Sequence, residues 1–253
     1  MANYQLIFSP TGGTQRVADC LGSGLWQDAE EIDLLDPALE EGPAWTFSES
    51  DVCLVAVPSF GGRVPAPAVQ RLARMRGGGA QAVLAVAYGN RAYDDTLLEL
   101  QDVLREGGFR PVAAVAAVAE HSLLHHFAAG RPDQEDRREL ADFAAEIHRR
   151  LDGETVPLPD LPGSRPYRAY GGLPLHPQGT GACTGCGQCA KVCPVQAIDP
   201  ATPRKTDKDR CITCMACVSR CPRKARRLNP FMQFVAGQKM KKVCGGRKPN
   251  ALF

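Results

Sequence analysis

The sequence of 253 residues predicts an α/β protein with a parallel sheet, followed by a small cysteine-rich domain. Short apolar runs alternate with helical patterns over the first 150 residues, and eight of the eleven cysteines fall between Cys183 and Cys221. The charge also changes sign along the chain. Residues 1–179 hold 15 Lys+Arg and 25 Asp+Glu, whereas residues 180–253 hold 15 and 3. We therefore expect a domain boundary just before residue 180.

Five strands and the helices between them account for the first part of the chain. Apolar runs typical of buried parallel strands span 4–8, 52–57, 83–87 and 112–118, with a weaker strand at 31–34. Helical patterns start at Thr14, span about 66–75, include Leu97 to Leu104, and include Leu140 to Leu151 after an acidic first turn. This alternation predicts a sheet covered on both faces, and five strands suit the doubly wound order 2-1-3-4-5. Such sheets bind ligands at the carboxyl ends of their strands.

The loop after the first strand is rich in glycine and hydroxyl groups and leads into a helix. Its residues are Ser9, Pro10, Thr11, Gly12, Gly13 and Thr14. Backbone N–H groups and hydroxyls in such a loop can hold a phosphate, and the helix dipole favours the negative charge. The Gly-Lys-Ser/Thr ending of a P-loop and the G-x-G-x-x-G dinucleotide pattern are both missing. The alternative interpretation is an ordinary strand-to-helix turn.

Two later loops, at the expected carboxyl ends of other strands, combine aromatic residues with glycine and arginine. The first contains Pro58, Ser59, Phe60, Gly61, Gly62, Arg63 and Val64, and the second contains Tyr88, Gly89, Asn90, Arg91 and Tyr93. An aromatic side chain on each side can sandwich a flat ring, while glycine lets the backbone approach the ring edge. The alternative is that these aromatic residues only cover the top of the sheet.

The cysteines of the last third form an internal repeat of Cys-x2-Cys-x2-Cys-x3-Cys-Pro, offset by 28 positions. This is the bacterial two-cluster ferredoxin pattern, in which the fourth cysteine of each run binds the other cluster. Thiolates suit iron, and this spacing can wrap three corners of a cubane. The pattern predicts two [4Fe–4S] clusters, one held by Cys183, Cys186, Cys189 and Cys221 and the other by Cys211, Cys214, Cys217 and Cys193. Two zinc sites are the alternative, but zinc ribbons usually show separated pairs of cysteines.

The motif Ser-x-Thr-Gly-x-Thr at residues 9–14 resembles the phosphate-binding loop of flavodoxins. Together with residues 58–65, 88–95 and 129–133, it makes most of the chain similar to a bacterial and archaeal family that fuses a flavodoxin-like domain to a two-cluster ferredoxin domain. The resemblance implies FMN, with its phosphate on Ser9–Thr14 and its isoalloxazine ring between the Phe60 and Tyr88 loops. Gly13 departs from many flavodoxins, which have Asn there, but the backbone donors remain.

Other cysteines and histidines have simpler interpretations. Cys20 and Cys53 are expected to be buried apolar residues, and Cys244 a free thiol in a basic tail. His121 and His125 are four positions apart and would share a helix face. A core role is the simplest interpretation of His121, although its place after the fifth strand also suits contact with a flavin.

The expected organisation is a flavodoxin-like domain at 1–152, a proline-rich linker at 153–179, a small α+β ferredoxin domain at 180–228 and a basic tail at 229–253. The positive second half either faces the acidic first domain or attracts an acidic redox protein. Nucleic-acid binding is not expected, because no DNA-binding motif accompanies the charge. The longest apolar run, 112–119, is too short for a membrane span, and the first residues show no signal-peptide pattern. These features predict a cytoplasmic protein without a membrane span.

The predicted function is electron transfer between two [4Fe–4S] clusters and FMN, and to or from a redox partner protein. The alternative is an FMN-dependent reductase of NAD(P)H, quinone or another small acceptor, with the clusters as an internal relay. A third is a ferredoxin whose first domain holds no flavin. We expect the Gly61–Gly62 backbone to contact the N5 edge of the flavin, and Arg63 or Arg91 to bias its charge. The sequence indicates no catalytic nucleophile.

Overall fold

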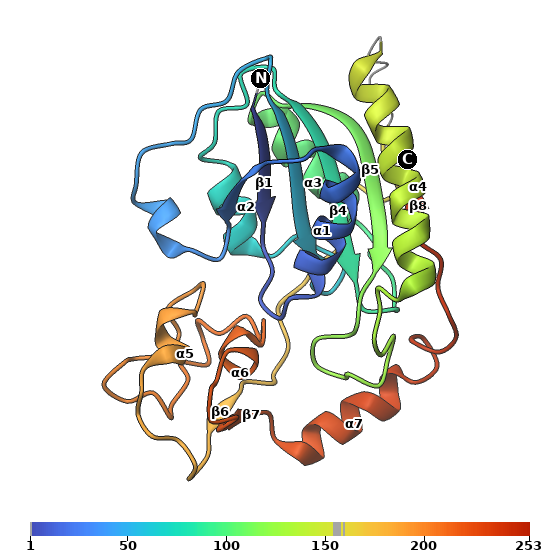
Figure 1. The fold of residues 1–253 in the computed structure, drawn as a ribbon. Helices are drawn as coiled ribbons and strands as arrows, with labels where there is room; N and C mark the ends of the chain where they lie inside the picture. Colours follow the sequence, from blue (N-terminus) through green and yellow to red (C-terminus); the bar gives the residue numbers. More distant parts are fainter. Residues whose placement is uncertain (1, 154–157, 159) are drawn as a thin grey trace.

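A six-stranded sheet with the order β2-β1-β3-β4-β5-β8 forms the centre of the larger domain (Figure 1). The computed structural model describes residues 2–153, 158 and 160–253. The five parallel strands are β1 (Asn3–Ile7), β2 (Glu30–Asp33), β3 (Val52–Pro58), β4 (Gln81–Tyr88) and β5 (Arg110–Val118). The predicted α/β class and the order 2-1-3-4-5 are confirmed.

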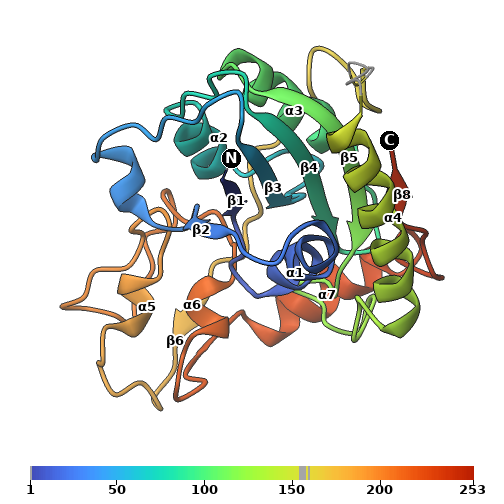
Figure 2. The ribbon, with the colours of Figure 1, turned by 45° about the horizontal axis from the view of Figure 1, so that its top comes forward.

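Four helices cover the two faces of the sheet, α1 and α4 on one and α2 and α3 on the other (Figure 2). They are α1 (Gly13–Leu25), α2 (Ala66–Leu72), α3 (Thr96–Glu106) and α4 (Gln134–Asp152), and a short 3-10 helix, η1 (Pro37–Glu40), follows β2. On one face Val17, Leu21 and Leu140 are buried, and on the other Leu72 and Leu97. Since the sheet is buried on both faces, its central strands are continuous apolar runs.

The sheet has a sixth strand, β8 (Ala251–Leu252), that the sequence did not predict. It runs antiparallel to β5, with Ala116 opposite Ala251. Two residues are too few to show the alternation by which a strand is recognised in a sequence. The strand covers part of the edge of β5, where backbone groups would otherwise remain unpaired.

Residues 229–253 form a helix and then return to the sheet. The helix, α7 (Pro230–Met240), begins where the Asn229 side chain accepts a hydrogen bond from the Phe231 N–H at 3.0 Å. Cys244, which follows the helix, is buried with 2% exposure. The segment therefore contacts the α/β domain at separate points, one of them the buried Cys244.

A buried carboxylate, Asp136, anchors this returning segment. Its side chain is fully buried and accepts hydrogen bonds from Asn250 Nδ2 at 3.0 Å, from Arg247 Nη2 at 3.1 Å and from the Arg131 guanidinium. Asn250 Oδ1 in turn accepts from the Val118 N–H at 2.8 Å. A carboxylate removed from water needs such donors, so the C-terminal residues complete the site around Asp136.

Part of the segment expected as a linker, 153–179, packs against the α2–α3 face, while 154–157 and 159 lie outside the described residues. Leu158 and Leu161 are buried in the core on that face. Arg165 donates two hydrogen bonds to Asp102 of α3, at 2.9 and 2.7 Å. These contacts fix the path of the chain from the first domain to the second.

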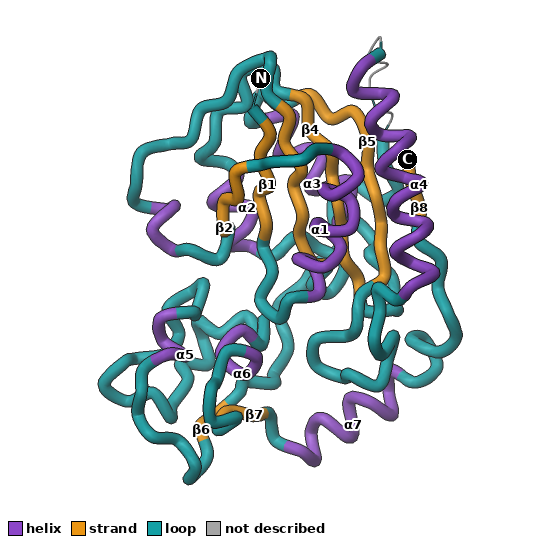
Figure 3. The backbone as a smooth tube through the Cα atoms, in the orientation of Figure 1, coloured by secondary structure: helices purple, strands orange, loops and turns teal. Residues whose placement is uncertain are grey.

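The cysteine-rich part is mostly loop, with two short helices and one two-stranded sheet (Figure 3). Its elements are β6 (Gln178–Gly179), α5 (Gln188–Lys191), α6 (Ala216–Ser219) and β7 (Arg226–Arg227). Arg71 of α2, which is fully buried, donates to the Pro194 carbonyl and so joins the two parts directly. Among the helices of the described residues, none is both long and apolar enough to cross a membrane.

Replacing Asn250 with alanine is expected to loosen the C-terminal strand. The change leaves the Val118 N–H and part of the Asp136 carboxylate without a buried partner, which lowers the free energy of unfolding by about 1–3 kcal/mol. Urea unfolding followed by circular dichroism measures this loss. Asn3→Ala is the matched control, because it removes only an exposed bond to the Asp28 carbonyl. Equal stability of the two variants would contradict the anchoring role.

The attachment of residues 247–253 is also expected to weaken in acid. Hydrogen bonds from Arg247 hold the pKa of Asp133 well below its usual range. A carboxylate with a depressed pKa stabilises the fold above its unfolded pKa, and this contribution disappears as the pH falls through the folded value. At pH values below about 4, the hydrogen-exchange protection of this segment should therefore decrease. Arg247→Met should show reduced protection already at pH 7, and protection equal to wild type would refute the ion pair's role.

Candidate functional site

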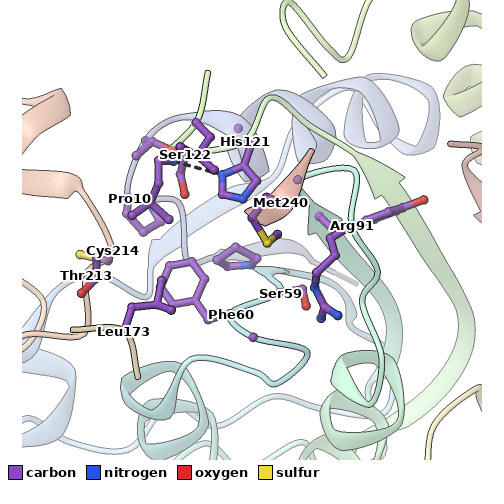
Figure 4. Close-up of a pocket in the computed structure, with 18 of the residues that line it drawn as sticks. Pro10, Ser59, Phe60, Arg91, His121, Ser122, Leu173, Thr213, Cys214 and Met240 are labelled. Carbon is purple, nitrogen blue, oxygen red and sulfur yellow. Dashed lines mark hydrogen bonds between the residues drawn. The ribbon is translucent and has the colours of Figure 1, made fainter. Parts of the chain in front are cut away.

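A cavity of about 580 Å³ lies at the carboxyl ends of the parallel strands (Figure 4). Its walls come from the loops after β1, β3, β4 and β5, from residues 168–175, from residues 212–214 and from α7. Both parts of the chain therefore bound one space, at the place where doubly wound sheets bind ligands.

Most residues that the sequence indicated for a flavin line this cavity, namely Pro10, Thr11, Gly13, Thr14, Pro58, Ser59, Phe60, Gly61, Tyr88, Gly89 and Arg91. Within the described chain, its walls do not include Ser9, Gly12, Gly62, Arg63, Val64, Asn90 and Tyr93. Several residues outside the cavity wall form hydrogen bonds that hold these loops in place.

The loop after β1 presents the N-terminus of α1 to the cavity. Ser9 is buried, and its hydroxyl accepts a hydrogen bond from the Gln15 N–H at 2.9 Å. Since the first N–H groups of a helix have no partner within it, those of Gly13 and Thr14 are available to a ligand. A Cβ at position 13 would lie in ordinary contact with the Ala119 Cβ, at 3.4 Å, so a branched side chain there would press on Ala119. The arrangement fits a phosphate group.

The two arginines of the loops have different places. Arg91 lines the cavity and forms an ion pair with Asp94. Arg63 instead donates to the Glu99 carboxylate through Nε at 2.8 Å and Nη2 at 2.6 Å, and this bonding raises the pKa of Arg63. The Val64 N–H also donates to Glu99, at 2.8 Å. Arg63 and Glu99 therefore hold this loop, and Arg63 does not line the cavity.

Polar groups of the loop after β4 are bound to the C-terminal segment. The Tyr88 hydroxyl donates to the Pro249 carbonyl at 2.9 Å, and the Tyr88 ring meets Tyr93 edge to face. Asn90 Nδ2 donates to the Cys244 carbonyl at 2.6 Å. The loop is thus positioned by the returning chain, a dependence that the local sequence could not indicate.

Tyr170 supplies an aromatic wall that no motif indicated. A Cβ at position 61 would lie 2.2 Å from the Tyr170 ring, so this ring packs directly on Gly61. Gly61 has φ of 60°, in the left-handed region that favours glycine. Phe60 and Leu173 flank the same side of the cavity (Figure 4).

His121, from the loop after β5, also faces the cavity (Figure 4). Its Nδ1 accepts a hydrogen bond from the Leu123 N–H at 3.2 Å, which places the proton of the neutral ring on Nε2. Burial is the main cause that lowers the pKa of His121 to about 4, so the ring is neutral at pH 7. It offers an uncharged N–H donor to a ligand.

The eight cysteines of the repeat surround two hollows. The first cysteine set, Cys183, Cys186, Cys189 and Cys221, lines one hollow. The second cysteine set, Cys193, Cys211, Cys214 and Cys217, lines the other. Across the described residues, no group of three or more His, Cys, Asp or Glu side chains is arranged to hold a single metal ion. Thiols placed around a hollow suit the separate corners of a cubane.

The two halves of the repeat share an unusual backbone. Residues 28 positions apart adopt the left-handed conformation in pairs, namely Gly185 and Thr213, Gly187 and Met215, and Gln196 and Lys224. Two N–H···S bonds follow the same repeat, from Ala197 to Cys193 and from Ala225 to Cys221, both at 3.2 Å. Threonine and methionine adopt this conformation at a cost, so surrounding contacts must impose it.

Burial keeps several of these thiols protonated while they carry no metal. It raises the pKa of Cys217 to about 11 and also raises the pKa of Cys189 and of Cys211. The positive charge of the nearby Arg226 guanidinium opposes this effect and favours a lower pKa for Cys189 and Cys217. Since metals bind the thiolate, iron uptake at these sites releases protons.

The second cysteine set adjoins the cavity. Cys214 and its neighbour Thr213 lie in the cavity wall (Figure 4). Of the first cysteine set, Cys186 is exposed at the surface. One set is therefore next to the loops in which a flavin is expected, and the other reaches solvent.

Comparison with known proteins identifies residues 182–226 as a 4Fe-4S dicluster domain. A curated relative is the NADH-quinone oxidoreductase subunit I 2 of Symbiobacterium thermophilum. It is 42% identical over 52 residues, and the match covers 16% of this chain and 22% of the relative. The chain thus spans about a fifth of the length of that protein.

Similar solved structures include a flavodoxin of Streptococcus pneumonia TIGR4, with 20% identity over 59% of this chain and 99% of that one and a TM-score of 0.39. A flavodoxin of Megasphaera elsdenii has 15% identity, coverage of 57% and 98%, and a TM-score of 0.37. The apo form of an NADH:FMN oxidoreductase has 16% identity, coverage of 62% and 91%, and a TM-score of 0.45. By its own strand order and its matched cysteine segment, the chain joins a flavodoxin-like α/β domain to a 4Fe-4S dicluster domain.

Proposed function

We propose that this protein transfers electrons between two [4Fe–4S] clusters and FMN, and exchanges them with a redox partner protein. The observation that carries the proposal is the shared cavity, because the flavodoxin-like loops and Cys214 line the same space. Groups held in one chain at such a junction need no diffusional encounter. When bound, FMN takes up one or two electrons, and each cluster takes up one.

The residues that would hold FMN come from the four loops of the sheet. The N–H groups of Gly13 and Thr14 suit its phosphate, and the Phe60 loop and Gly89 suit the flat ring. His121 offers a neutral donor to the ring edge. The two cysteine sets would hold the clusters, one in each hollow.

Side chains from outside the sheet also line the cavity. Tyr170 and Leu173 come from the segment before the cysteine domain, and Gln233 and Met240 come from α7. Apolar side chains around a site lower the local dielectric constant, so the charges around a bound flavin act more strongly on it. The position of Cys214 in the same walls favours electron delivery through the second cysteine set.

The first cysteine set is the proposed point of exchange with the partner protein. Cys186 is exposed, Arg223 lines the same hollow, and Arg204 donates to the Cys183 carbonyl at 3.0 Å. Positive side chains at this edge suit a partner with an acidic surface.

Gly13→Val is expected to weaken FMN binding without loss of iron. The branched side chain crowds Ala119 and narrows the cavity at the N-terminus of α1. We expect the dissociation constant for FMN to rise about tenfold or more, which is about 1.4 kcal/mol. Titration of flavin-free protein, followed by quenching of FMN fluorescence, measures this. Gly181→Val is the control, since nothing lies within 4 Å of a Cβ there. Unchanged affinity in Gly13→Val argues against the phosphate site.

Cys214→Ser is expected to slow electron transfer between the clusters and the flavin. The change disturbs the set that adjoins the cavity. Anaerobic stopped-flow mixing with reduced methyl viologen, followed by the flavin absorbance, should show a decrease of about tenfold or more. Cys20→Ser, which lies outside both sets, should leave the rate unchanged.

The same apparatus tests the reductase alternative. Rapid flavin bleaching by NADH or NADPH alone, at equal rates in Cys214→Ser and wild type, would reject the electron-carrier proposal in favour of a reductase. Purified protein that holds iron but no FMN would reject both.

A further inference from the structure

Arg226, in β7, is a buried cation between the two cysteine sets. The residue is almost fully buried, with 2% of its surface exposed. Nη1 lies 3.9 Å from the Sγ of Cys189, in the first cysteine set. Through Nη2 the same guanidinium donates to Pro177 and Thr206, which line the hollow of the second cysteine set. A single side chain therefore lies between the two hollows.

The partners that the structure gives this guanidinium are uncharged. Nη1 donates to the Pro203 carbonyl, and Nη2 donates to the Pro177 carbonyl at 2.9 Å and to the Thr206 hydroxyl. Nε is buried and has no hydrogen-bond partner within the described residues. A buried charge is unfavourable unless an opposite charge lies near it. Four thiolates around an oxidised [4Fe–4S] core carry a net charge of about −2, so each bound cluster supplies such a counter-charge.

The internal repeat shows that the local fold does not require an arginine here. The position 28 residues earlier is Ile198, which is buried with 4% exposure in the first half of the domain. The two halves share their left-handed residues and N–H···S bonds, so Ile198 and Arg226 occupy equivalent places. An apolar residue suffices in one half, whereas the other half holds a charge.

We propose that Arg226 sets the reduction potentials of both clusters by fixing a positive charge between them. Each cluster gains one negative charge when it accepts one electron, and a nearby cation stabilises that reduced form. The guanidinium thus raises both potentials and weakens the repulsion between two reduced clusters. This inference rests on the proposed function, because it requires that both cysteine sets hold clusters.

The test is an anaerobic redox titration of the full-length protein, monitored by EPR of both reduced clusters. Arg226→Gln removes the charge, and both midpoint potentials should shift to more negative values. Arg226→Lys keeps the charge and should lie closer to wild type. Arg227→Gln, at the exposed neighbour, should shift neither potential. Thr206→Val removes one partner of the guanidinium but keeps its charge, and should also leave both potentials near the wild-type values.

Failure of the proposed function and failure of the Arg226 role give different results. Wild-type protein without iron would refute the proposed function itself. Iron-loaded Arg226→Gln with unchanged potentials refutes only the role of Arg226, as does Arg226→Lys with potentials as low as those of Arg226→Gln. If neither variant takes up iron, wild-type protein labelled with ¹⁵N-arginine decides. Pulsed EPR should then detect a ¹⁵N coupling on both reduced clusters, and a missing coupling on either one overturns the inference.

Discussion

The placement of the second half of the molecule depends on the hydrogen bonds that satisfy Asp136. This carboxylate is buried at the start of α4 and is bonded by Arg131, Arg247 and Asn250. Two of these donors come from residues 247–250, so the C-terminal segment completes the hydrogen bonds of a group buried inside the α/β domain. The segment that returns also carries α7, which forms one wall of the cavity.

The cysteine domain is therefore held at both of its ends and once in the middle. The preceding segment is bound through Arg165 and Asp102, the following segment through Asn250, and the Cys193–Pro194 turn through Arg71. Three separated attachments restrict rotation of one part against the other. Electron transfer between sites depends steeply on their separation, so a fixed arrangement suits the proposed transfer between the second cysteine set and a flavin in the cavity.

The features that the sequence revealed are those with a local pattern. The parallel strands appear as apolar runs because both faces of the sheet are buried, and the cysteine repeat shows its period of 28 directly. Features decided by distant contacts escaped such reasoning. Arg63 was expected near a flavin, but its partner Glu99 lies 36 positions away. Tyr170 belongs to a proline-rich stretch without a motif, and Arg226 resembles its exposed basic neighbours until burial distinguishes it.

The strand β8, which widens the sheet, comes after every other element of the described fold in the chain and is therefore synthesised after them. Phe253 pairs with Ala114 through two backbone hydrogen bonds, at 2.8 and 3.3 Å, and β8 lies beside β5. All eight cysteines of the repeat are synthesised before this closure takes place. The returning segment is therefore fixed to β5 only after the rest of the described fold, both cysteine sets included, has been synthesised.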